Sequence, residues 1–186
     1  MRKSSYRSAE LNYGHFFQFL VGFHRPKVRV EFGILDGFSL MNMAAAGNNL
    51  ARGPDIAAYD IFEKFEGNHA GPEIVQRFKS YPNVSIREGD FYGVYQEIPD
   101  GSVDILHVDI ANDGDVYKFA VEKYMGKLRP SGLMILEGGS EERDCVDWMV
   151  RYEKPKIREF LRQNRAHNFE YVTINIFPSV TIIKAK

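Results

Sequence analysis

The chain has 186 residues, 44% hydrophobic and 26% charged, which is typical of a folded globular domain and excludes a disordered or collagen-like chain. Its 24 Lys and Arg nearly balance its 25 Asp and Glu, whereas a dedicated nucleic-acid binder usually carries a basic excess, so that class is disfavoured. Cys145 is the single cysteine, which excludes an internal disulfide and a multi-cysteine zinc site.

Membrane and export signals are also missing from the sequence. No apolar run approaches the roughly 18 residues that a membrane-spanning helix needs. The basic residues after Met1 are followed by polar residues and not by the apolar core of a signal peptide. We therefore expect a cytoplasmic protein with no membrane partner.

The first half of the chain alternates helix-like and strand-like segments. A helix is expected over residues 8–22, with Ser8 as its N-cap and Gly22 as its stop. Three short strands and two further helices follow: strands at 27–32, 55–60 and 83–87, and helices at 39–46 and 72–79.

The second half continues the alternation and then changes to a hairpin. A turn is expected over residues 129–132, and Pro155 is expected to break the helix that Ser140 caps. The other predicted elements are strands at 103–109 and 133–136, a helix at 116–128, a helical piece ending near 164, and an antiparallel hairpin of strands at 169–177 and 180–183.

This order predicts an α/β fold. Strands linked by helices form parallel sheets, because a parallel pair needs a crossover connection. We expect a single-domain three-layer α/β/α sandwich over residues 1–186, with a seven-stranded, mostly parallel sheet and an antiparallel C-terminal hairpin strand. Residues 1–26 form an N-terminal helical extension in this prediction, and the loop over residues 47–55 is its weakest point.

A glycine turn between the first strand and its helix is the sharpest chemical signal. Gly33 and Gly37 bracket this turn, and glycine lets the backbone take positive φ angles and approach a ligand closely. Ile34 and Leu35 stand where a dinucleotide fingerprint needs its middle glycine, and no Walker lysine is present. The turn therefore favours a nucleoside ligand without phosphates over a pyrophosphate, although a purely structural turn is the alternative.

Acidic residues follow the next strands. Asp60 can accept hydrogen bonds from ribose hydroxyls, and Asp90 from an adenine amino group, with Phe91 lining the base. Asp109 ends the fourth strand. The alternatives are a strand-end or capping aspartate at 60 and a turn with a core aromatic at 90–91. Since carboxyl ends of parallel strands share one sheet edge, the ordered set is more specific than any member.

At this point the sequence resembles the class I S-adenosylmethionine-dependent methyltransferases, from about residue 27 to the end. The first motif of that family, acid-x-Gly-x-x-x-Gly-x-Ser, is matched by Glu31, Gly33, Gly37 and Ser39. The resemblance implies that these four residues, together with Asp60, Asp90, Phe91 and Asp109, bind S-adenosylmethionine.

Within that class, Leu106-His-Val-Asp109 is similar to a subgroup of small-molecule and sugar O-methyltransferases. This implies methyl transfer to a hydroxyl oxygen of a small-molecule acceptor, by direct in-line displacement in which the protein mainly positions the acceptor. Asp109 and His107 are the candidate catalytic bases, since both lie on one face of their strand by alternation. For His107, a buried structural histidine is the alternative.

A divalent metal is a further hypothesis. Asp109, Asp113 or Asp115, and Glu137 would supply the oxygen ligands that Mg²⁺ prefers. Solvated acidic turns are the alternative. Glu137-Gly138 stands where the subgroup has His-Asp, which leaves a catalytically silent cofactor-binding or oligomeric module as a second hypothesis.

Two other features leave alternatives open. Six basic residues between Arg151 and Arg165 could attract an acidic substrate or RNA, or form a solvated helix face; a nucleic-acid methyltransferase is the alternative enzyme. Four phenylalanines near the N-terminus could line an acceptor pocket, form a homodimer contact, or be the buried face of a helix: Phe16, Phe17, Phe19 and Phe23.

Overall fold

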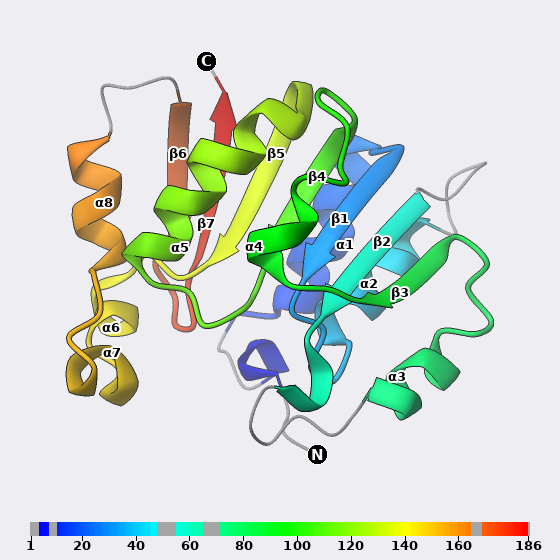
Figure 1. Ribbon diagram of the computed structural model, residues 1–186, viewed down its shortest axis with the longest axis horizontal. Coiled ribbons are helices and arrows are strands. Elements are labelled where there is room, and N and C mark those ends of the chain that lie inside the picture. The colour runs from blue at the N-terminus through cyan, green and yellow to red at the C-terminus, as the bar shows by residue number, and fades with distance from the viewer. Residues whose placement is uncertain (1–3, 8–10, 48–54, 65–70, 165–168, 186) are drawn as a thin grey trace. The chain divides into compact units, whose positions relative to one another are not determined.

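The structure is a computed structural model that describes residues 4–7, 11–47, 55–64, 71–164 and 169–185. Its contacts divide the chain into two compact units, Met1–Val94 and Tyr95–Lys186. Figure 1 labels the helices and strands of both units. Each unit is described by itself.

The first unit contains three parallel strands in the order β3-β2-β1. The register places Phe32 beside Tyr59 and Asp60 beside Glu88, so the carboxyl ends of the strands lie at one edge. Its elements are η1 (Ser5–Arg7), α1 (Tyr13–His24), β1 (Val28–Phe32), α2 (Phe38–Gly47), β2 (Asp55–Asp60), η2 (Phe62–Lys64), α3 (Gly71–Arg77), β3 (Val84–Glu88) and α4 (Phe91–Val94).

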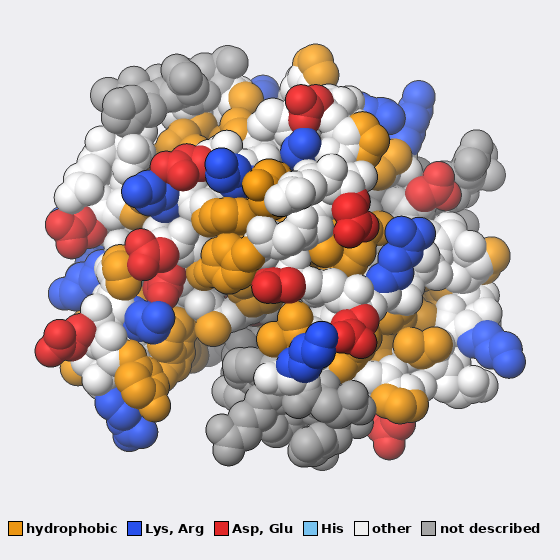
Figure 2. Space-filling model, viewed as in Figure 1, with side chains coloured by type: hydrophobic (Ala, Val, Ile, Leu, Met, Phe, Trp, Pro, Cys, Tyr) orange, Lys and Arg blue, Asp and Glu red, His pale blue; other side chains and the backbone are white. Residues whose placement is uncertain are grey.

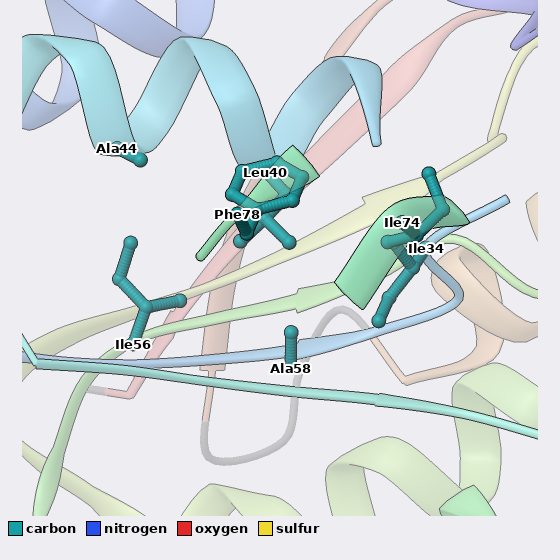
Figure 3. Close-up of a cluster of buried hydrophobic side chains, with 7 residues drawn as sticks. All are labelled: Ile34, Leu40, Ala44, Ile56, Ala58, Ile74 and Phe78. Atoms are coloured by element: carbon teal, nitrogen blue, oxygen red, sulfur yellow. The ribbon is translucent and has the colours of Figure 1, made fainter. Parts of the chain in front are cut away.

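Side chains on alternating positions of β2 build the core of this unit. Ile56 and Ala58 point to the face that α2 covers with Leu40 and Ala44, and Figure 3 shows these four side chains together. The rest of this buried cluster comes from the turn after β1 and from the region of α3: Ile34, Ile74 and Phe78. As a result, α2 and the turn that precedes it pack against the strands.

The first long helix differs from its prediction over residues 8–22. α1 begins after Asn12, whose side chain accepts a hydrogen bond from the His15 N–H at 3.2 Å, and Ser8 lies outside the described residues. Gly22 lies inside the helix, which continues to His24 and ends where Arg25 takes a left-handed conformation. The Arg25 N–H bonds the Val21 carbonyl there, so a residue other than glycine supplies the cap.

The second unit has the strand order β4-β5-β7-β6, with β4 and β5 parallel. β7 is antiparallel to both β5 and β6, which confirms the C-terminal hairpin. Its elements are β4 (Val103–Val108), α5 (Gly114–Phe119), η3 (Ala120–Tyr124), η4 (Met125–Lys127), β5 (Leu128–Glu137), α6 (Glu141–Asp144), α7 (Asp147–Arg151), α8 (Ile157–Gln163), β6 (Phe169–Ile174) and β7 (Val180–Ala185).

Two local predictions for this unit need correction. The turn expected at 129–132 lies inside β5, but the pairing with β4 is irregular there: Val103 pairs with Leu128 and Ile105 with Leu133. The extra residues of β5 are accommodated by Ser131 at φ 68°. The helix that Ser140 caps ends at Asp144, well before Pro155, which lies in the loop before α8.

The predicted α/β fold, with mostly parallel pairing and an antiparallel C-terminal hairpin, is confirmed, and the described residues hold the expected seven strands. The single-domain organisation over residues 1–186 stays a prediction. Among the described residues, every helix is too short or too polar to cross a membrane.

Candidate functional site

The glycine turn lies between β1 and α2 in the first unit. Gly33, Leu35 and Gly37 have φ angles of 85°, 47° and 72°. The Gly33 N–H donates to the Tyr59 carbonyl at 2.9 Å, and the Gly37 N–H donates to the Ile34 carbonyl at 2.7 Å. Leu35 is not a glycine, so its left-handed backbone persists only because the surroundings hold it.

Asp60 is the main support of this turn. Its Oδ2 accepts hydrogen bonds from the N–H groups of Ile34 at 2.7 Å and Leu35 at 3.2 Å. Its Oδ1 accepts one from the Phe62 N–H at 2.7 Å. This buried carboxylate therefore ties the end of β2 to the turn after β1. The sequence predicted a ribose-binding role for Asp60, and that role stays a prediction. It did not predict these hydrogen bonds to the backbone of the turn, which we call the brace.

A buried acid–hydroxyl pair lies beside the turn. The Ser39 hydroxyl, in the first turn of α2, donates to Glu31 Oε1 at 2.5 Å, and Glu31 is fully buried in β1. The structure thus brings together Glu31, Gly33, Gly37 and Ser39 as the motif predicts. Arg29 is also buried on β1, where desolvation lowers its pKa to about 9 while the charge of Glu31 opposes this. Nothing in the sequence pattern singled out Arg29.

Asp90 and Phe91 lie at the start of α4. The exposed Asp90 accepts a hydrogen bond from the Tyr92 N–H at 3.1 Å and caps this short helix. Phe91 is buried and packs edge-on against Phe32, with ring centroids 5.2 Å apart. These contacts are those of the structural alternative, a turn with a core aromatic. An adenine-binding role for either residue stays a prediction.

The candidate bases of the second unit have different environments. His107 is fully buried within β4, whereas Asp109 follows the strand and is half-buried. Asp109 lies within the electrostatic reach of Glu137 and Arg143. Of the two residues, Asp109 is therefore the less buried.

Asn112 connects the ends of β4 and β5. Its side-chain amide donates to the Val108 carbonyl at 2.9 Å and to the Glu137 carbonyl at 2.8 Å. The buried hydroxyl of Tyr117 also donates to the Glu137 carbonyl, at 3.2 Å. Asn112 is fully buried, and the sequence offered only its position after Asp109 as a signal.

Glu137 forms a buried ion pair with Arg143. Arg143 Nε donates to Glu137 Oε1 at 2.6 Å, and Nη2 donates to the Asn112 carbonyl at 3.0 Å. Desolvation raises the pKa of Glu137 to about 8; the charge of Arg143 opposes this rise and that of Asp109 adds to it. The guanidinium also lies over the Trp148 ring, 5.1 Å from its centroid. Sequence reasoning did not identify Arg143.

The proposed metal ligands do not form a cation site. Asp113 Oδ1 caps α5 by accepting from the Val116 N–H at 3.0 Å, and its Oδ2 pairs with Lys154 at 3.5 Å. Glu137 is bound to Arg143, a cation of the chain itself. Within the described part of the chain, no three His, Cys, Asp or Glu side chains are placed to hold a metal. As placed, Asp109, Asp113 and Glu137 do not fit Mg²⁺, and the metal stays a prediction.

A comparison with protein families matches residues 30–137 to a family described as "Methyltransferase domain". The search of the curated proteins gave no match. Solved structures share the fold at low identity, as three of them illustrate.

The methyltransferase PaMTH1 of Podospora anserina, bound to SAH, has a TM-score of 0.72 at 16% identity, covering 94% of this chain and 78% of its own. An O-methyltransferase of Bacillus cereus, in complex with SAH, has a TM-score of 0.67 at 19% identity, covering 94% and 80%. The O-methyltransferase TomG of Streptomyces achromogenes, in complex with SAM, has a TM-score of 0.64 at 14% identity, covering 98% and 86%.

Proposed function

The chain belongs to the methyltransferase-domain family, and we propose that it transfers a methyl group from S-adenosylmethionine to a hydroxyl oxygen of a small-molecule acceptor. Two fold neighbours are O-methyltransferases with SAH or SAM bound, which supports both the cofactor and the oxygen acceptor.

The observation that carries this proposal is the Glu31–Ser39 pair beside the glycine turn. The cofactor has an amino-acid end and a nucleoside end. A buried carboxylate at Glu31 suits the ammonium of the amino-acid end, and the positive φ angles of Gly33 and Gly37 shape the turn that follows β1. Asp60 holds the turn in this shape and is the proposed partner of the ribose hydroxyls.

When bound, the sulfonium of the cofactor supplies a methyl group already activated for transfer. The chain then has to bind the acceptor, exclude water and take one proton from the acceptor hydroxyl. We assign proton removal to a carboxylate oxygen of Asp109, because it follows β4 and is half-buried. His107 is the second candidate, and its enclosure in β4 suits a positioning role better than proton transfer.

The distribution of charge on the face shown in Figure 2 supports a small acceptor over a nucleic acid. On the face shown in Figure 2, blue basic and red acidic side chains are interspersed, without a broad basic field. The basic residues of α8 are also partly compensated: Arg158 pairs with Glu141 at 2.7 Å. RNA binding that weakens steeply with salt would favour the nucleic-acid methyltransferase instead.

Calorimetry with S-adenosylhomocysteine tests the cofactor. The wild-type chain should bind it, and Ser39→Ala should bind about ten-fold more weakly, because a hydrogen bond to a buried carboxylate is lost. Ser85→Ala is the matched control: Ser85 lies in β3 and donates to the Ile56 carbonyl at 3.3 Å, away from the turn. No binding by the wild type at millimolar ligand would reject the function.

A turnover assay separates the enzyme from a silent module. With S-adenosylmethionine at a saturating concentration, Asp109→Asn should lose turnover of a hydroxyl acceptor by about a hundred-fold, the usual contribution of a general base. Binding by the wild type without turnover over a broad acceptor panel would favour the silent cofactor-binding module.

A further inference from the structure

We propose that Arg7 is a positioning residue for the cofactor site: it binds Asp36 and thereby holds the second half of the glycine turn in its binding shape. The effect of Arg7 on cofactor binding rests on the proposed function. The stabilisation of the turn by Arg7 is independent of that function.

Asp36 is a buried carboxylate in the middle of the turn. Its side chain is 2% exposed, and Arg7 Nε donates to its Oδ2 at 2.7 Å. A buried charge is costly unless it is paired, so this carboxylate depends on its partner. The partner lies 29 residues earlier in the chain and is itself 42% exposed.

Arg7 also contacts the helix that follows the turn. Its guanidinium carbon lies 4.6 Å from the centre of the Phe38 ring, and Phe38 is the first residue of α2. The Phe38 N–H donates to the other Asp36 oxygen at 3.3 Å. One guanidinium thus holds Asp36 and Phe38 together, immediately before Ser39 of the proposed site.

A buried aromatic side chain places Arg7 at this position. Tyr6 is 1% exposed, and its ring packs against Tyr13 and Phe17 of α1 at centroid distances of 5.1 and 5.3 Å. This packing anchors η1, and with it the backbone of Arg7, to α1.

A second arginine binds the backbone of the same residue. Arg77, at the end of α3, donates from Nη1 to the Asp36 carbonyl at 2.6 Å. Asp60 holds the first half of the turn through Ile34 and Leu35. Because Leu35 is in a left-handed conformation, the turn needs support on both sides, and Arg7 supplies it after Leu35.

Binding of S-adenosylhomocysteine to the full chain tests the coupling. Arg7→Ala should weaken binding about ten-fold, which is the effect of losing one charge-assisted hydrogen bond. Arg7→Lys should recover part of the affinity, since it keeps the charge but not the planar group over Phe38. Lys79→Ala, which removes an exposed positive charge from the same unit, is the control and should bind like the wild type.

A double-mutant cycle separates this pair from two independent effects. If Arg7 acts through Asp36, the double variant Arg7→Ala/Asp36→Asn should bind no more weakly than the poorer single variant. Affinity losses that multiply in the double variant would overturn the proposal, as would an Arg7→Ala affinity within two-fold of the wild type.

Amide hydrogen exchange of the cofactor-free chain tests the hold on the turn separately from the proposed function. The Gly37 and Phe38 amides should exchange about ten-fold faster in Arg7→Ala than in the wild type or Lys79→Ala. Unchanged exchange would refute the hold even if the cofactor binds. Faster exchange in a chain that does not bind S-adenosylhomocysteine would keep the hold and reject the proposed function.

Discussion

Replacement of Asp60 should destabilise the protein much more than an ordinary surface change. Its carboxylate accepts hydrogen bonds from three backbone N–H groups, those of Ile34, Leu35 and Phe62. In Asp60→Ala these donors lose their partner, and each buried, unsatisfied donor costs about 1–3 kcal/mol. Relaxation and water entry will recover part of this, so we expect a loss of about 3–5 kcal/mol in the free energy of unfolding.

Urea and thermal unfolding measure this loss. For a chain of this size, 1 kcal/mol corresponds to roughly 2–4 °C, so the melting temperature of Asp60→Ala should fall by about 10 °C. Asp60→Asn keeps one acceptor oxygen and should lose about half as much. Asp55→Asn, at the exposed opposite end of β2, is the control and should change stability by less than about 1 kcal/mol, the range of an exposed charged contact.

The outcome also decides between two roles of Asp60. If Asp60→Ala unfolds like the wild type, the carboxylate is not the brace of the turn and the reasoning fails. If Asp60→Asn folds and binds S-adenosylhomocysteine as the wild type does, binding needs no negative charge at residue 60, which argues against a charge-assisted contact of Asp60 with the ribose.

Three further measurements test other parts of the structure. Gly37→Ala should lose about 1–3 kcal/mol in the free energy of unfolding, because the φ of Gly37 is 72° and a Cβ there would lie 2.9 Å from Phe78. Gly22→Ala, in an open position of α1, should instead gain about 0.5–1 kcal/mol, and equal effects of the two substitutions would contradict this reasoning. Burial raises the pKa of Glu137 to about 8, above its unfolded value, so its contribution to stability is complete at low pH and is lost as the pH rises toward 8. Unfolding curves should therefore show the wild type losing stability relative to Glu137→Gln between about pH 5 and pH 8, and a constant difference would argue against a raised pKa. Millimolar Mg²⁺ should shift the melting temperature by less than about 1 °C, because the stabilisation RT ln(1 + [L]/Kd) is small when the ion binds weakly. A clear rise would support the metal hypothesis at Asp109, Asp113 and Glu137.

The fold was predictable from the pattern of apolar, glycine and proline residues within short segments of the sequence. Strands, helices and the C-terminal hairpin were predicted from the period of their apolar residues and from glycine and proline positions, which depend on neighbours within a few residues. The glycine turn was predicted from residues within one short segment, and the motif placed Glu31 and Ser39 on either side of it, although the hydrogen bond between them was not predicted.

The partners of the polar side chains were decided by the tertiary structure. Asp60 binds backbone groups 25 and 26 residues away, and Arg7 reaches Asp36 across 29 residues. Whether a carboxylate binds a ligand, a helix end or a backbone turn depends on which donors the fold brings to it, because most buried polar groups in proteins are hydrogen-bonded. The sequence by itself determined where the acids lie along the chain, and the packing of α1, β2 and the turn decided what Asp36 and Asp60 bind.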